Sequence, residues 1–128
     1  MSAMSQPPPL PHPEAEWRAH LAAGRFMLQR SRASGAFVFY PRIAQPGTGA
    51  QDLEWVPACG EGRIHAATLV RRRNPAESYN VVLVDLAEGP RLMSRVDGIA
   101  ADAVTIGMPV KARIIEEEGQ PLLVFVPA

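Results

Sequence analysis

The feature that most constrains the fold is a series of strand-length segments that fills the second half of the chain. Five such segments follow Gly60, each rich in residues that favour strands and most of them ended by a turn signal. They are residues 63–72, 79–86, 91–96, 110–116 and 122–126. A longer connection, residues 99–108, separates the third segment from the fourth, and Glu118-Gly119 is a hairpin signal before the fifth. The pattern predicts that this half of the chain is all-β.

The apolar pattern within these segments indicates how the strands are covered. Lys111 and Arg113 alternate with apolar neighbours, as in a strand with one face toward a core. Residues 79–86 are nearly all apolar, so we expect a central strand that is covered on both faces. Five strands with one long connection fit a small closed barrel of the OB type.

The N-terminal half begins with a proline-rich stretch and a short helix. We expect residues 1–13 to form a flexible tail, the alternative being an arm that lies along a partner. A helix is expected from Pro13 to Gly24, with Trp17 and Leu21 on one face. Because a helix of this length is not stable alone in water, Trp17 must dock on this chain or on another.

Residues 25–58 have the pattern of a small hairpin module. Short strands are expected at residues 26–28, 36–40 and 53–56, with a turn between the first two. The expected organisation is a tail (1–13), a helix with the hairpin module (14–58) and a barrel (59–128).

Charge balance and cysteine usage exclude several classes of protein. The 13 acidic and 13 basic residues give zero formal net charge, which argues against a protein that neutralises nucleic-acid phosphates. No apolar run is long enough to span a bilayer, and the N-terminus does not match a signal peptide. The single cysteine, Cys59, cannot form an internal disulfide, so we expect a cytoplasmic protein.

Several short motifs, taken in order, resemble a known family. They include Tyr40-Pro-Arg42, Leu53-Glu-Trp-Val56, Gly60-Glu-Gly62 and Ile106-Gly-Met108. Their order and spacing, from about Trp17 to Phe125, are similar to those of the zinc-ribbon and OB-fold accessory proteins that accompany thiolases and other acyl-CoA enzymes. The resemblance implies a rubredoxin-like zinc-ribbon hairpin beside the five-stranded OB barrel.

The sequence departs from this family at the zinc ligands. The family's ribbon usually holds zinc with four cysteines, and the matching positions here are Ser31, Ser34, Gln45 and Thr48. Neutral hydroxyl and amide groups are poor zinc ligands. We therefore predict a degenerate ribbon without metal, held instead by its aromatic residues Phe37, Phe39, Tyr40 and Trp55.

The residue types that carry catalysis are scattered along the chain. Cys59 and His65 are separated by two glycines, and neither His12 nor His20 has metal-ligand spacing to another histidine. We therefore predict no catalytic residue, no cofactor and no enzymatic activity.

Asp85 interrupts the apolar run of residues 79–86 and needs a partner. We expect it either to pair with an arginine such as Arg91 or to cap a turn.

The strongest charge cluster is Arg71, Arg72 and Arg73, at the end of the first barrel strand. We interpret it as a ligand-binding cluster, either for the phosphates of coenzyme A or for an acidic partner. The alternative is a solvated strand end. The acidic run at residues 116–118 is its candidate counterpart.

Three functions follow from these observations. The resemblance implies a non-catalytic accessory subunit of an acyl-CoA-processing enzyme such as a thiolase-like protein, with Trp17 and Phe26 as partner-binding residues. A second hypothesis is direct binding of acyl-CoA by the barrel. A third is a single-stranded nucleic-acid module, which the barrel disfavours because Tyr79 and Phe125 are its only aromatic residues. Whether the chain forms a homo-oligomer stays open.

Overall fold

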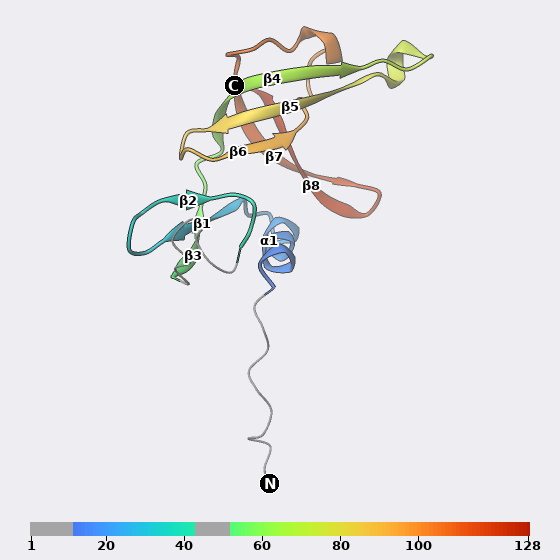
Figure 1. Ribbon diagram of the computed structural model, residues 1–128. Coiled ribbons are helices and arrows are strands. Elements are labelled where there is room, and N and C mark those ends of the chain that lie inside the picture. The colour runs from blue at the N-terminus through green and yellow to red at the C-terminus, as the bar shows by residue number, and fades with distance from the viewer. Residues whose placement is uncertain (1–11, 43–51) are drawn as a thin grey trace.

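The computed structural model describes residues 12–42 and 52–128, in which a helix and a small sheet precede a larger, curled sheet (Figure 1). The first part contains α1 (Pro13–Ala22), β1 (Met27–Ser31), β2 (Phe37–Val38) and β3 (Leu53–Pro57). The second part contains β4 (Glu61–Val70), β5 (Tyr79–Leu86), β6 (Arg91–Ser94), β7 (Pro109–Glu117) and β8 (Gln120–Pro127). Two short 3-10 helices, η2 (Pro75–Glu77) and η3 (Ala101–Ala103), lie in connections. The described residues contain no helix with the length and hydrophobicity needed to cross a membrane.

Helix α1 has the start and the end that its sequence predicts. Pro13 opens it, and the acidic side chains of Glu14 and Glu16 lie in the first turn, where the helix dipole favours them. Gly24 follows the helix with φ near +80°, a conformation that a residue without a Cβ adopts at no steric cost. Leu21 is the buried residue of the helix.

The hairpin module is a three-stranded antiparallel sheet in the order β2-β1-β3. Gln29 of the central strand is buried and faces both Val38 and Trp55 in the register. Its side-chain amide donates a hydrogen bond to the carbonyl of Arg42 and accepts one from the amide of Arg42, both 2.6 Å long. This reciprocal pair holds the chain beside β1 after β2 has ended. Two of the four positions that match the family's zinc-binding cysteines, Gln45 and Thr48, lie outside the described residues.

The second sheet confirms the predicted all-β fold with a five-stranded OB barrel. Its strand order is β6-β5-β4-β7-β8, with every neighbouring pair antiparallel. The sheet curls so that its two ends meet beyond β6. There, the amide of Phe125 donates to the carbonyl of Arg95 (3.0 Å), and the amide of Asp97 donates to the carbonyl of Phe125 (2.8 Å).

The prediction for strand β5 was right about its place in the sheet and wrong about its coverage. As a central strand, β5 lies between β4 and β6. Alternate side chains of β5 are fully buried, among them Val82, Val84 and Leu86, whereas Val81 and Leu83 are only half-buried. A curled sheet has a concave face that packs on the core and a convex face near solvent, so this apolar strand is fully covered on one face alone.

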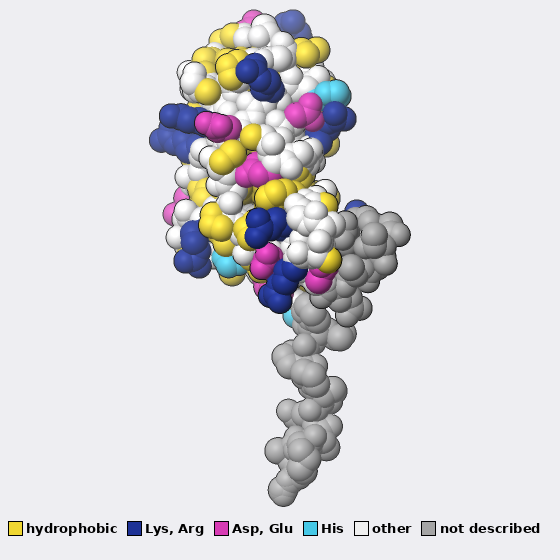
Figure 2. Space-filling view, turned by 90° about the vertical axis from the view of Figure 1, so that its left-hand side faces the viewer, with side chains coloured by type: hydrophobic (Ala, Val, Ile, Leu, Met, Phe, Trp, Pro, Cys, Tyr) yellow, Lys and Arg dark blue, Asp and Glu magenta, His cyan; other side chains and the backbone are white. Residues whose placement is uncertain are grey.

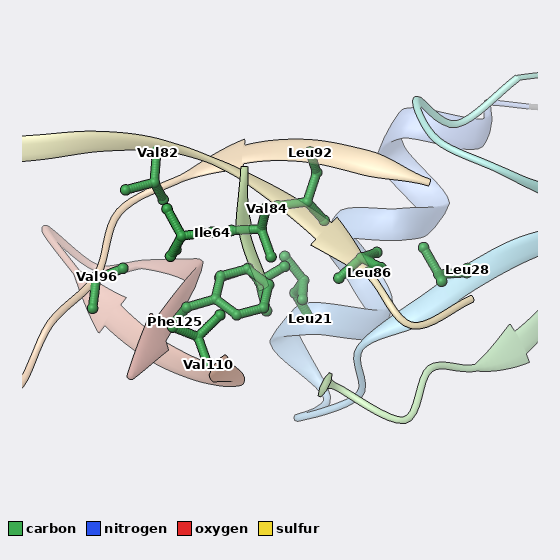
Figure 3. Packing of buried hydrophobic residues seen from close by; sticks show 11 residues of the cluster. Leu21, Leu28, Ile64, Val82, Val84, Leu86, Leu92, Val96, Val110 and Phe125 are labelled. Carbon is green, nitrogen blue, oxygen red and sulfur yellow. The ribbon is translucent and has the colours of Figure 1, made fainter. Parts of the chain in front are cut away.

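One continuous core joins the two sheets. Figure 3 shows Phe125, which is completely buried, with Val84 and Val110 close to its ring. Leu21 of α1 and Leu28 of β1 belong to the same cluster, at exposures of 3% and 1%. The helix and the ribbon therefore contribute side chains to the core of the barrel and are not separate modules attached to it.

Candidate functional site

The turn that contains Ser31 and Ser34, two of the positions matched to the family's cysteines, is held by a carboxylate. Ser31 is completely buried, and its hydroxyl donates a hydrogen bond of 2.9 Å to the Oδ2 atom of Asp52. The amide of Ala33 donates to the same oxygen at 2.7 Å, and the amide of Ser34 donates to the Ser31 hydroxyl at 3.3 Å. The bond from Ala33, and then the bond from Ser31, lower the pKa of Asp52 below its ordinary value.

This donor set does not fit zinc. The Ser31 hydroxyl is already engaged with Asp52, and a neutral hydroxyl is a weak ligand for Zn²⁺. Over the described ranges, no three His, Cys, Asp or Glu side chains come together in a way that could hold a metal ion. The absence of zinc remains a prediction, since Gln45 and Thr48 are not described.

The predicted role of aromatic residues in holding the ribbon together is partly visible. Trp17 of α1 contacts Phe39 edge to face, with ring centroids 5.6 Å apart. Trp55 of β3 packs against His20 at 5.3 Å and donates from Nε1 to Glu16. His20 is thereby half-buried between the helix and the ribbon.

The Trp17 side chain packs within this chain and also borders an open hollow. It is half-buried, and its indole Nε1 is inaccessible to solvent without a hydrogen-bond partner among the described residues. It also lines a hollow of about 350 Å³ between α1 and the edges of β6 and β8, together with Met93, which is 69% exposed. Trp17 therefore docks on this chain and also borders an open surface.

Phe26, the second predicted partner-binding residue, lies in a different groove. This groove, of about 840 Å³, separates the end of α1 and β1 from the β7–β8 hairpin. Phe26, Ala58 and Ile114 give it apolar walls, and the exposed Cys59 lies in it. The structure thus places Trp17 and Phe26 at separate openings along the junction of the two sheets.

The three predicted ligand-binding arginines lie at the tip of the β4–β5 hairpin and are all exposed. Arg71 lines a hollow of about 630 Å³ that also includes Tyr79 and Asp102. The guanidinium of Arg72 lies 5.5 Å from the centre of the Tyr79 ring. The arginine cluster is far along the hairpin from the ribbon, so it does not form one site with Trp17 or Phe26 (Figure 1).

The predicted pairing of Asp85 with Arg91 is confirmed, and a third residue joins it. Arg91 donates from Nε to Oδ1 of Asp85 at 2.6 Å, and Nδ1 of His65 lies 3.3 Å from Oδ2. The bond from Arg91 is the main cause that lowers the pKa of Asp85. All three side chains are more than two-fifths exposed and none lines a hollow described above, so Asp85 and Arg91 form a surface ion pair with His65 beside it.

Sequence reasoning missed His65 and Asp52. A β-bulge follows Ile64, because Ile64 pairs with Val84 while Ala66 pairs with Leu83, and it leaves His65 as the extra residue beside Asp85. Spacing along the sequence gives no sign of that bulge. Asp52 lies 21 residues from Ser31, and its place directly before a predicted strand was the only available signal.

Charged and apolar groups are mixed over the molecular surface. Figure 2 shows basic and acidic side chains interspersed with hydrophobic ones over one face, rather than gathered by sign. Among the barrel's aromatic residues, Phe125 is completely buried, and Tyr79 is 39% exposed with Arg72 over its ring. A row of stacking platforms of the kind that binds single-stranded nucleic acid is therefore missing from residues 59–128.

Comparison with known proteins extends these observations. Residues 55–114 match the family described as "ChsH2, C-terminal OB-fold domain". A solved structure described as "Ltp2-ChsH2(DUF35) aldolase" is 32% identical and covers 94% of this chain and 98% of its own, with a TM-score of 0.80. A DUF35 protein of unknown function from Sulfolobus solfataricus, 14% identical over 89% of this chain and 84% of its own, has a TM-score of 0.65 and supports the fold alone.

A curated protein from Thermomonospora curvata also matches. It is described as "Probable enoyl-CoA hydratase alpha subunit" and is 32% identical over 130 residues, which is 98% of this chain. The chain spans only 41% of the length of that relative.

Proposed function

Because this chain belongs to the ChsH2 (DUF35) family, we propose that it is a non-catalytic accessory subunit of an acyl-CoA-processing enzyme. The observation that carries the proposal is the likeness over nearly the full length of both chains to the solved protein described as an aldolase with ChsH2. The relative described as a hydratase subunit supports the same class, because there the matching region is part of a longer polypeptide.

The partner that we propose is thiolase-like, as the sequence resemblance implies. The alternative is a hydratase or an aldolase, which are also enzymes that process acyl-CoA. The surface at the junction of the two sheets suits such a partner. Two apolar grooves open there, and tryptophan, phenylalanine and methionine side chains are typical anchors at protein interfaces. We assign Trp17 and Phe26 to this contact and place the complex in the cytoplasm.

A native pull-down tests the proposal. The tagged chain is purified from its own organism at low ionic strength, and the retained proteins are identified and quantified by mass spectrometry. An acyl-CoA enzyme recovered in near-equal amount supports the accessory role, whereas recovery of the bait alone contradicts it. Ile106→Ala, at an exposed position that lines neither groove, serves as the surface control beside Trp17→Ala.

Direct binding of acyl-CoA by the barrel is the second candidate. The observation that favours it is the hollow of about 630 Å³ beside Arg71 and Tyr79, since arginine recognises phosphates and an aromatic ring stacks on a base. Calorimetric titration with several acyl-CoA esters tests direct binding. The absence of measurable heat with all of them contradicts acyl-CoA binding by the barrel.

A further inference from the structure

The β4–β5 hairpin extends beyond the rest of the barrel and carries an unneutralised basic tip. Figure 1 shows this hairpin leaving the barrel at the upper right. Arg71, Arg72 and Arg73 follow β4 directly and are exposed. Within the described part of the chain, none of the three forms an ion pair, although five other arginines do. We call residues 71–73 the basic tip.

The basic tip is held in place before any partner binds. The amide of Arg72 donates to the Ser78 hydroxyl at 3.0 Å, which ties the two sides of the loop together. The Arg72 guanidinium lies over the Tyr79 ring, and the side chain of Asn74 accepts a hydrogen bond of 3.1 Å from the amide of Ala76. A loop ordered in this way loses little conformational entropy when it binds.

The acidic run at residues 116–118 does not neutralise the basic tip. It lies at the turn of the β7–β8 hairpin, and β7 pairs with β4 only through Glu61, Gly62 and Arg63. Beyond these residues the two hairpins separate (Figure 1). Glu117 is instead engaged by Arg95, at 3.0 Å. The acidic run is therefore not an ion-pair partner of the basic tip, because it lies on the other hairpin and Glu117 is paired with Arg95.

The surroundings of the basic tip decide which kind of anion it fits. The hollow beside Arg71 also contains Asp97 and Asp102, and Asp97 is paired with Arg95 at 2.9 Å. Glu77 is exposed in the same loop. These carboxylates repel a doubly charged phosphate more strongly than a singly charged carboxylate, and a partner protein can also place cations opposite them.

We propose that the basic tip is a docking element for a carboxylate-rich patch on a partner protein, and this rests on the proposed accessory function. Arginine suits that role because its planar guanidinium donates two parallel hydrogen bonds to one carboxylate. The tip lies on a different element from Trp17 and Phe26. A partner that contacts both is held by an apolar junction and by a separate electrostatic contact that sets its orientation.

Charge reversal in the full chain tests this proposal. The variant Arg71→Glu/Arg73→Glu leaves Arg72 on Tyr79, and Lys111→Glu/Arg113→Glu is the matched control on exposed positions of β7. Affinity is measured for immobilised poly-L-glutamate and for the enzyme recovered in the pull-down. The tip variant is expected to bind both about tenfold or more weakly, while the control binds like the wild type, and binding falls as salt rises. Circular dichroism confirms that both variants fold.

Two results overturn the proposal. One is equal affinity of the tip variant and the control for poly-L-glutamate. The other is tighter binding of a single-stranded oligonucleotide or of coenzyme A than of poly-L-glutamate, lost in the tip variant, which assigns the arginines to phosphate. If the pull-down recovers no enzyme while the poly-L-glutamate contrast holds, the proposed function fails and the docking element stands.

Discussion

The hydroxyl of Ser31 donates a hydrogen bond of 2.9 Å to the carboxylate of Asp52, and this contact links the turn after β1 to the start of β3. The sequence resemblance implies that Ser31 stands where zinc-binding ribbons have a cysteine. A half-buried, hydrogen-bonded carboxylate therefore ties together two segments that, by this resemblance, a metal ion would join in such ribbons.

Removing the Ser31 hydroxyl should loosen this connection. Ser31→Ala takes away one donor to Asp52 and the acceptor for the Ser34 amide, so we expect the free energy of unfolding to fall by about 1 kcal/mol. Denaturant unfolding measures the loss. Ser34→Ala is the control, because its side chain bonds only to an exposed loop amide at Ala36. Equal losses in both variants contradict the role given to Ser31.

Acid should weaken the same connection. The folded-state pKa of Asp52 lies below its ordinary value of 3.8, so ionised Asp52 stabilises the folded state above about pH 4. That stabilisation is lost as the pH falls through the lowered pKa. Thermal unfolding of wild type and Asp52→Asn should differ at neutral pH and converge in acid. Asp85 also has a lowered pKa, but both proteins carry it, so its effect cancels in the difference. A difference that is independent of pH contradicts the prediction.

The shared core predicts that ribbon and barrel unfold together. Leu21→Ala removes a fully buried side chain at their junction and should cost about 2–5 kcal/mol, whereas Met93→Ala, at an exposed position, should change stability by less than about 0.5 kcal/mol. Both tryptophans lie in the helix and ribbon, so their fluorescence reports on that part while circular dichroism reports mainly on the barrel. The two signals should give one common midpoint. Separate midpoints support instead the division expected at residue 59.

Trp17 can be tested for its two roles separately. Trp17→Phe keeps an aromatic ring against Phe39 and removes the indole N–H, which has no partner among the described residues. We expect this variant to stay within about 1.5 kcal/mol of the wild type but to recover less enzyme in the pull-down. Trp17→Ala should lose both stability and recovery. Full recovery with Trp17→Phe means that a phenyl ring is enough for the partner contact, because the N–H is inaccessible to solvent.

Most of the fold could be predicted from the sequence because its signals are local. Alternating residues and turn formers located all five barrel strands, and proline and glycine located the ends of α1. Asp85 could be paired with Arg91 because a buried-strand carboxylate needs a nearby cation, and a short turn returns the chain to it. The coverage of β5 could not be predicted, since a continuous apolar run does not reveal the curvature of its sheet.

The candidate surfaces depend on contacts between residues far apart in the sequence. The partnership of Ser31 with Asp52 crosses 21 positions, and His65 reaches Asp85 only through a β-bulge. The separation of the basic tip from the acidic run follows from which strands pair and over how many residues. Residue type and spacing do not encode these relationships, so only the three-dimensional arrangement exposes them.

The insertion of Leu21 and Leu28 into the barrel core has a consequence for assembly. Two modules joined by a loose linker must be aligned each time they bind a common partner, and the alignment costs entropy. Here the grooves beside Trp17 and Phe26 and the β4–β5 hairpin are carried by a single packed body. The proposed binding elements therefore keep their spacing in the free state, and we expect a partner whose contact sites have another spacing to bind more weakly.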